Sequence, residues 1–434
     1  MKNIFLYLFC LTPVLLLTGP FLPGVSVSII GLYGIYCLKK IKIIKENKIL
    51  INFLIIFFFF YIYLLLISYN SIKPEDSFRS SIFYFRFTFF SLGSYFLIYN
   101  LKEKAYPLIG YSILCSFLIV FVSLLIEIIF NFYSENPIID GQITGIFFSE
   151  KIAGSYISKL YPLGIGIIYF CDLKLFKLSK KDITQIFFLV SLFSVLVSGE
   201  RTSIVIFLIS NIILIIGLGA YRQTIFNKKN ILFTFILFIF LILIVNSVFE
   251  RVIYKTYSQI SEDNQINIFS KHHESHLKTA YKMFNNNKIF GIGPRMFRFL
   301  CDDEKYEDIY DIQIQYNNNG TPKYKNGEIH VKEYNGCSTH PHNLFFQLLS
   351  ETGLIGIIFY LIFLFSIFFQ LYKSLARKNE LIYDKNKIIS FTILTCLFSS
   401  FFPFLPSNNF FGSYVNIFYY FIITFYFMNK NETS

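Results

Sequence analysis

The sequence predicts an all-α polytopic membrane protein with about twelve transmembrane helices and one large outer loop that carries amphipathic helices. Of its 434 residues, 54% are hydrophobic and only 15% are charged, whereas a soluble domain carries roughly 25% charged residues. The mean hydropathy is correspondingly high, at +0.54. The apolar residues are also grouped in long runs. This composition excludes a disordered chain, a coiled coil and a secreted disulfide scaffold.

Twelve apolar runs are candidates for crossing a bilayer, which takes roughly 20 residues of helix. They are residues 4–18, 22–38, 49–68, 81–99, 106–130, 152–171, 183–198, 203–220, 230–248, 343–371, 387–405 and 409–428. The first run is similar to the apolar part of a signal peptide. Because no A-x-A-like cleavage site follows it, we expect it to remain as a helix.

The distribution of lysine and arginine predicts the orientation of these spans. With the N-terminus inside, the inner segments hold 21 basic residues and the short outer loops hold six. Short cytoplasmic loops accumulate Lys and Arg, so we expect both termini in the cytoplasm. The net charge of +12 is then mainly a topology signal. We therefore expect membrane lipids as partners and no nucleic acid.

One outer loop differs from the others in length and polarity. Residues 249–341, here called the cap, hold twelve basic and twelve acidic residues, and the six histidines of the chain lie in the cap or directly after it. Long polar insertions between apolar segments usually carry function. We expect one integrated membrane domain made of residues 1–248 with nine spans, the cap, and residues 342–434 with three spans.

The most specific motif joins the cap to the tenth span. It consists of His342 and Asn343, nine residues, Gly353, two residues and Gly356. At a helix start an imidazole is both hydrated and held in place, and histidine suits general acid or base chemistry near neutral pH. Asn343 is a candidate helix cap, and the glycines allow close packing against a neighbouring helix. An interfacial histidine without catalytic function is the alternative.

Two arginines are candidate phosphate-binding residues. Arg201 lies in a short outer turn between the seventh and eighth spans, and Arg295 follows the Gly-rich turn at residues 290–294. A guanidinium group can bind phosphate through two parallel hydrogen bonds. Arg201 could instead extend to lipid headgroups. The Gly-rich turn lacks the preceding strand of a dinucleotide fingerprint, so a lipid-linked diphosphate suits it better. The arginines would hold this leaving group while His342 activates a nucleophile.

The motif from His342 to Gly356 resembles that of the bacterial O-antigen ligase and O-antigen polymerase superfamily. Residues 278–284 and 290–294 are similar to the segment that leads into the catalytic loop of these proteins. Residues 145–156 resemble one of their outer-loop motifs. The resemblance covers most of the chain, and only the 342–356 motif is specific.

The resemblance implies an integral-membrane glycosyltransferase of the class C type in the bacterial inner membrane. Such proteins transfer a glycan from undecaprenyl diphosphate to an acceptor hydroxyl on the periplasmic side, with inversion and without metal or other cofactor. The acceptor is a lipid A-core sugar in the ligases and a lipid-linked glycan in the polymerases. The single large outer loop favours a ligase. A non-enzymatic transporter or flippase of lipid-linked sugars is a further alternative.

The resemblance also assigns roles to individual residues. His342 matches the catalytic histidine, and Arg201 matches the arginine that contacts the diphosphate. Many members carry an arginine about where His273 stands here. The second diphosphate-binding residue is therefore either His273 or Arg295.

The histidines of the cap also raise a metal hypothesis. His272 and His276 are one helical turn apart, but the pattern is not H-E-x-x-H, and a further ligand would have to come from His330 or His340. We expect no metal.

The remaining expectations concern cysteines and acidic residues. Cys301 and Cys337 are the only cysteines outside the predicted spans, and in an oxidising compartment they form either a disulfide or two free thiols. Glu351 is expected to make a structural pair rather than to act as a base. Arg86 is expected to pair with Glu127, with attraction of a phosphate as the alternative.

Overall fold

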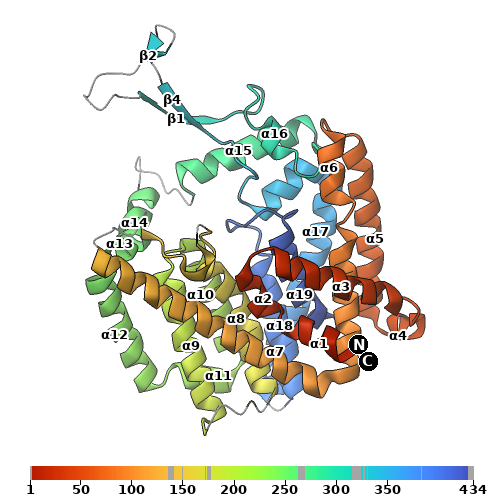
Figure 1. The fold of residues 1–434 in the computed structure, drawn as a ribbon, viewed down its shortest axis with the longest axis vertical. Coiled ribbons are helices and arrows are strands. Elements are labelled where there is room, and N and C mark those ends of the chain that lie inside the picture. The colour runs from red at the N-terminus through yellow and green to blue at the C-terminus, as the bar shows by residue number, and fades with distance from the viewer. Residues whose placement is uncertain are drawn as a thin grey trace.

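The computed structural model is mostly helical, and its helices form a bundle with the cap at one end (Figure 1). It describes residues 2–134, 141–148, 150–171, 173, 177–261, 269–314, 324–325, 328–329, 331–382 and 384–428. The α-helices are α1 (Lys2–Cys10), α2 (Thr12–Leu15), α3 (Phe21–Cys37), α4 (Ile41–Glu46), α5 (Lys48–Tyr69), α6 (Pro74–Ser81), α7 (Phe85–Ser134), α8 (Ala153–Phe170), α9 (Lys180–Val197), α10 (Arg201–Gly217), α11 (Gly219–Ile225), α12 (Lys228–Ile244), α13 (Asn246–Phe249), α14 (Lys255–Ile260), α15 (Lys271–Asn286), α16 (Phe297–Leu300), α17 (Leu344–Ala376), α18 (Lys385–Ser400) and α19 (Ser413–Tyr426).

Each of the twelve apolar runs contains a helix, as expected for segments whose backbone groups must be satisfied away from water. Within the described residues, three helical segments are long and apolar enough to cross a membrane, namely Lys48–Tyr69, Pro74–Asn131 and Leu344–Ala376. Phe21–Cys37 and Arg201–Gly217 are shorter apolar helices. These segments are typical of an integral membrane protein. The number of twelve crossings and the orientation of the spans stay predictions.

The expected loop between the fourth and fifth spans is a kink inside α7. Leu101, with φ −135° and ψ 35°, is the residue that leaves the helical conformation there, and Pro107 lies six positions later within the helix. A proline removes one backbone donor from a helix interior and often accompanies a kink. Two predicted spans therefore follow one another with little intervening loop.

The centre of the bundle is α8, which is buried along nearly its whole length. It packs against α9, α10 and α18. Small residues allow these close approaches. For example, a Cβ atom on Gly166 would lie 1.9 Å from the Thr392 hydroxyl of α18, and one on Gly154 would lie 2.3 Å from the Ser203 hydroxyl of α10. The N-terminal end of α8 is thereby fixed beside the short turn that precedes α10.

The cap is only partly helical, which corrects the expectation of an all-α fold. It contains α15 and α16, but also β1 (Ile309–Ile314), β2 (Tyr324–Lys325), β3 (Glu328–Ile329) and β4 (Val331–Asn335). The β1 and β4 strands pair in antiparallel fashion, from Ile314 opposite Val331 to Ile309 opposite Asn335. From Tyr310 to Ile314, β-branched and aromatic residues alternate with polar ones, which favours a strand over an amphipathic helix. The resulting ribbon projects from the bundle (Figure 1).

Candidate functional site

Five histidines from two segments of the chain converge beneath the ribbon of the cap. Three lie on α15 and two lie on the segment that leads into α17. The ring centroids of His340, His276 and His273 lie 4.1, 5.1 and 6.0 Å from that of His342. The fifth, His272, lies 4.3 Å from His276. His342 is therefore the centre of the group, which we call the histidine cluster.

The first half of the cluster is positioned by the start of α15. Ser270 caps this helix, and its hydroxyl accepts a hydrogen bond from the His273 backbone N–H at 3.4 Å. His276 is completely buried on the inner face of the helix. Its Nδ1 donates to the carbonyl oxygen of Gly336 at 2.9 Å, because a carbonyl can only accept. The neutral His276 ring consequently presents an unprotonated Nε2 to the cluster.

The second half is positioned by the strained entry into α17. His342 adopts a left-handed backbone conformation with φ +52°, which is uncommon for a residue with a side chain and concentrates at functional sites. Its carbonyl accepts from the Ser407 N–H at 2.8 Å. Asn343 caps α17 by accepting from the Phe346 N–H at 3.0 Å, and it donates to the carbonyl of Pro403 at 3.0 Å. The neighbouring contacts thus hold His342 in place.

The electrostatics of the cluster keep its imidazoles neutral near pH 7. Burial, followed by the charges of His276 and His272, lowers the pKa of His342 to about 4. Burial, followed by the charge of His342, also lowers the pKa of His273 to about 4 and that of His340 to about 3. A neutral imidazole has the free electron pair that a proton acceptor needs.

The turn before α10 brings together two segments singled out in the sequence. Glu200 is buried, and its carboxylate accepts from the backbone N–H of Gly154 at 2.6 Å and from the Ser155 hydroxyl at 2.7 Å. A carboxylate at a helix N-terminus satisfies free N–H groups and interacts favourably with the helix dipole. Glu200 therefore joins the turn to the start of α8.

Arg201, the first residue of α10, extends toward the cap. Its Nη1 donates to Gln259 Oε1 at 2.7 Å and to Thr256 Oγ1 at 3.4 Å, both on α14. Its charge also contributes to lowering the pKa of His273, so it acts on the histidine cluster. Within the described residues Arg201 forms no ion pair, and its guanidinium retains donors that could hold an anion.

The Gly-rich turn has a structural function that the sequence did not indicate. Its Ile292 and Gly293 N–H groups donate to the carbonyls of Ser350 and Glu351 in α17, at 3.0 and 2.9 Å. These donors are consequently not free to hold a diphosphate, which corrects the interpretation of the turn as a headgroup site. Of the groups in and after this turn, only the side chain of Arg295 remains a candidate diphosphate contact.

Arg295 follows this turn and is itself unusual. It has a left-handed backbone conformation with φ +61°, and its half-buried side chain makes no hydrogen bond or ion pair with any described residue. Its charge lowers the pKa of Arg298, after burial. Arg298 donates to the Thr339 carbonyl at 3.2 Å and helps to lower the pKa of His340. Arg298 is thus the arginine that contacts the segment before α17, a role that its position in the sequence did not indicate.

Gly353 breaks α17 where the Gly-rich turn meets it. Its φ of 62° and ψ of −165° are accessible essentially only to glycine. A Cβ atom there would lie 2.3 Å from the Ile289 carbonyl oxygen, and the next N–H, of Leu354, donates to the Lys288 carbonyl at 2.8 Å. Gly353 therefore packs against the cap and not against a neighbouring helix. At Gly356 the atoms nearest an added Cβ belong to Thr352 of its own helix, and the expected close helix contact there stays a prediction.

The acidic residues have structural partners. Glu351 is fully buried, and its Oε1 accepts from the Phe297 N–H at 3.1 Å. Its Oε2 accepts from the Gln347 side chain at 3.0 Å, so Glu351 connects α16 to α17. The expected pairing of Arg86 with Glu127 is wrong. Arg86 donates to Ser413 at 2.8 Å, while Glu127 accepts from two backbone N–H groups at residues 144 and 145.

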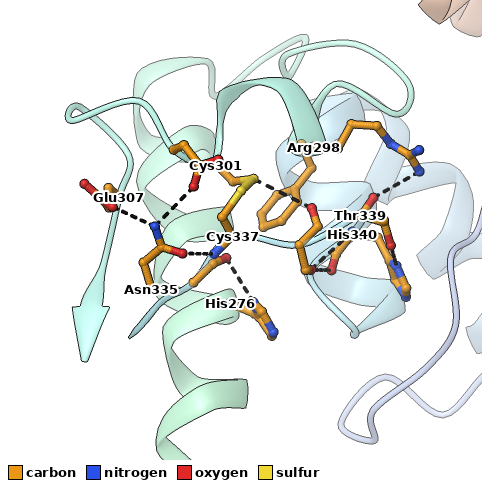
Figure 2. The surroundings of a disulfide bond; sticks show 12 residues. His276, Arg298, Cys301, Glu307, Asn335, Cys337, Thr339 and His340 are labelled. Carbon is orange, nitrogen blue, oxygen red and sulfur yellow. Dashed lines mark hydrogen bonds between the residues drawn. A yellow bond between two sulfur atoms is a disulfide. The ribbon is translucent and has the colours of Figure 1, made fainter. Parts of the chain in front are cut away.

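A disulfide joins Cys301 to Cys337, with the Cα atoms 4.8 Å apart (Figure 2). It connects the end of α16 to the segment that follows β4. Gly336, directly before Cys337, supplies the carbonyl that holds His276. Asn335, two residues before Cys337, donates from its side-chain amide to the Glu307 carboxylate at 2.6 Å. The disulfide therefore fixes the segment on which the orientation of His276 depends.

Replacing Cys301 and Cys337 with serine is expected to destabilise the cap by about 3–4 kcal/mol, because the bond closes a loop with a sequence separation of 36 residues. Thermal unfolding of the purified protein would measure this, and alkylation of free thiols would confirm the bonding. Cys115→Ser, at an exposed free cysteine, is the control. Equal stability of the double variant and this control would contradict the prediction.

The described residues contain one set of three potential metal ligands whose atoms lie within 4.8 Å of one another, namely Cys301, Asp302 and Cys337. Cys301 and Cys337 form the disulfide, so neither offers a thiolate to a metal. The nitrogen atoms of the described histidines do not form such a set. His330, the other ligand considered, lies outside the described residues.

Comparison with known proteins identifies part of the chain. Residues 186–361 match the model of a protein family described as O-antigen ligase. The match runs from α9 into α17 and includes Arg201, the histidine cluster and the motif from His342 to Gly356. Members of this family are membrane glycosyltransferases that act as ligases or polymerases on lipid-linked glycans. Among curated proteins, none matches the chain.

Proposed function

We propose that this chain, whose residues 186–361 carry an O-antigen ligase domain, is a ligase that transfers a glycan from undecaprenyl diphosphate to a hydroxyl of a lipid A-core sugar. The observation that carries the proposal is His342. It belongs to the matched segment, it is held in a left-handed backbone conformation, and its imidazole is neutral near pH 7. A neutral imidazole held in a fixed position can accept a proton as a general base.

The chemistry would be a single displacement at the anomeric carbon, with inversion. The acceptor oxygen forms the new bond while the bond from the anomeric carbon to the diphosphate oxygen breaks, and its electron pair stays on the diphosphate. The acceptor proton passes to His342. Arg201, Arg295 and His273 are the proposed diphosphate-binding residues, since cationic or protonated donors stabilise the charge that develops on the leaving group. No metal and no other cofactor takes part in this scheme.

The proposal includes the arrangement of the chain in the membrane. Residues 1–248, the cap and residues 342–434 would form one domain in the bacterial inner membrane, with both termini in the cytoplasm and the site in the periplasm. The family match supports a single unit, because it extends across both ends of the cap.

Deletion of the gene followed by electrophoresis of lipopolysaccharide tests the proposal. A ligase predicts the loss of all long chains from the lipid A-core, together with accumulation of lipid-linked polymer. Cores that each carry one repeat unit would instead identify a polymerase. Accumulation of lipid-linked single units with no polymer would favour a flippase and would contradict a transferase.

A further inference from the structure

We propose that His276 and His340, together with His273, form an anion receptor that binds the diphosphate and takes up protons as the diphosphate enters. This inference deepens the proposed function and rests on it, since it names groups that would hold the leaving group beyond Arg201 and Arg295. The receptor would recognise the diphosphate group itself, whichever glycan is attached to it.

Three ring nitrogens of the cluster have no hydrogen-bond partner among the described residues. They are His276 Nε2, His340 Nε2 and His273 Nδ1. His276 is completely buried and His340 is 8% exposed. Nearly all buried polar groups are hydrogen-bonded, and leaving one unpaired costs about 1–3 kcal/mol. Three unpaired nitrogens around one histidine therefore indicate a binding site for a ligand with several hydrogen-bonding atoms.

The His276 ring is held in one orientation. Its Nδ1 is occupied by the carbonyl of Gly336, so Nε2 is its remaining polar atom. Gly336 in turn is fixed by close packing, because a Cβ atom there would lie 2.4 Å from the Ser275 carbonyl oxygen. The disulfide at Cys337 holds the same segment (Figure 2). The ring is thus held with Nε2 directed to the cluster before any ligand arrives.

The charges around the cluster are mainly positive. On α15, the only carboxylate near the cluster is Glu274, which pairs with Lys278 at 2.9 Å. The turn before α10 contributes the charge of Arg201 to His273, and the segment after the Gly-rich turn contributes that of Arg298 to His340.

The other residues near the histidine cluster add no unpaired negative charge. Tyr310 of β1 contacts His272 with ring centroids 5.8 Å apart and is neutral when protonated. Glu351 of α17 is engaged with backbone and amide donors. Among the described residues no carboxylate forms an ion pair with any of the five imidazoles. The charges that face the cluster are positive, so a multiply charged anion is favoured over a metal cation.

The proton balance follows from these surroundings. The free imidazoles are neutral near pH 7, because burial and mutual repulsion lower the pKa of His273 to about 4 and of His340 to about 3 and also lower that of His276. A diphosphate diester carries two negative charges and raises these pKa values on binding. Each imidazole that takes up one solvent proton exchanges an acceptor nitrogen for an N–H donor to a phosphate oxygen. After transfer, the same donors would face the additional negative charge on the released diphosphate.

Calorimetry of the purified full-length protein in detergent tests the inference. A diester probe, P1-geranylgeranyl P2-methyl diphosphate, whose charge does not change between pH 6 and pH 8, is titrated at pH 7 in buffers with different ionisation enthalpies, which reports the protons taken up by the protein. We expect about one proton per diphosphate and, from linkage, about tenfold tighter binding for each pH unit between pH 8 and pH 6. Binding without proton uptake and without this pH dependence would overturn the inference.

Two variants and one matched control assign the effect to residues. His276→Gln and His340→Gln should each reduce the proton uptake and weaken binding by about tenfold, because each removes one titrating group. Asn285→Gln, at an exposed position of α15, should bind and take up protons like the wild type. If one histidine variant fails to fold, the other variant and the pH dependence of the wild type still decide the question. Unchanged uptake in a folded variant would exclude that residue.

Two further measurements separate this inference from the proposed function. P1,P2-dimethyl diphosphate, which has the same charged group and no prenyl chain, should bind with the same proton uptake. Binding of the prenyl diester without binding of this dimethyl diester would mean that the lipid is recognised and would overturn a diphosphate receptor. Glycan transfer is assayed in parallel. Proton-linked binding without transfer would retain the receptor and refute the transferase. Glycan transfer together with proton-independent binding would support the transferase and refute the receptor.

Discussion

Replacement of His342 with alanine is expected to reduce glycan transfer by about 10²- to 10⁴-fold, the usual contribution of a positioned general base. His342 lies at the centre of the histidine cluster, and its neutral ring is the group proposed to accept the acceptor proton. The measurement is transfer of the lipid-linked glycan in membranes that contain equal amounts of wild type and variant protein. A variant that retains normal transfer would refute the catalytic assignment.

The left-handed backbone at His342 makes this test sharper. A glycine adopts φ +52° without strain, whereas an alanine there retains a strain of roughly 1–2 kcal/mol. We therefore expect His342→Gly to be more stable than His342→Ala by about 1 kcal/mol and equally inactive. Thermal unfolding compares the two proteins. Recovery of activity in the more stable variant would mean that His342 acts through stability and not through proton transfer.

Replacement of Gly353 with alanine is expected to destabilise the protein by about 3 kcal/mol or more. The added methyl group would lie 2.3 Å from the Ile289 carbonyl oxygen, on a backbone conformation that side chains rarely adopt. Relief of this contact would separate the Gly-rich turn from α17 and would break the hydrogen bond from Leu354 to Lys288. The thermal unfolding temperature and the yield of monodisperse protein in detergent measure the effect.

Gly24→Ala provides the matched control for this variant. Gly24 lies in α3, and a Cβ atom there meets nothing within 4 Å. Alanine is also the better helix former, so this variant should be at least as stable as the wild type. Equal stability of the Gly353 and Gly24 variants would show that the break in α17 is not required.

The sequence predicted the helical part of the fold well and its interruptions poorly. Every apolar run contains a helix, because lipid leaves few other ways to satisfy the backbone. The kink at Leu101 and the break at Gly353 depend on contacts with distant segments, which a hydropathy profile does not contain. The β1–β4 ribbon was missed because its polar and apolar residues alternate over only a few positions.

The candidate site could be predicted as a set of residue types but not as an arrangement. The clustering of histidines in the cap was visible in the sequence, whereas the approach of α15 to the segment before α17 depends on tertiary packing. Arg298 was missed although it stands three positions after Arg295. Gln347 offered a weak signal as a lone amide in an apolar run, and it proves to bridge Glu351 and Asn409.

The hydrogen bonds between the Gly-rich turn and the broken α17 have a consequence for biosynthesis. The turn is synthesised before α17, and its N–H groups at residues 292 and 293 find their acceptors only when that helix arrives. The carbonyls of Ser350 and Glu351 are equally unpaired until then, and an unpaired carbonyl costs several kcal/mol in lipid. Maturation of the site is therefore coupled to insertion of α17. A nascent chain stalled before this step would present an incomplete cap to proteases and chaperones.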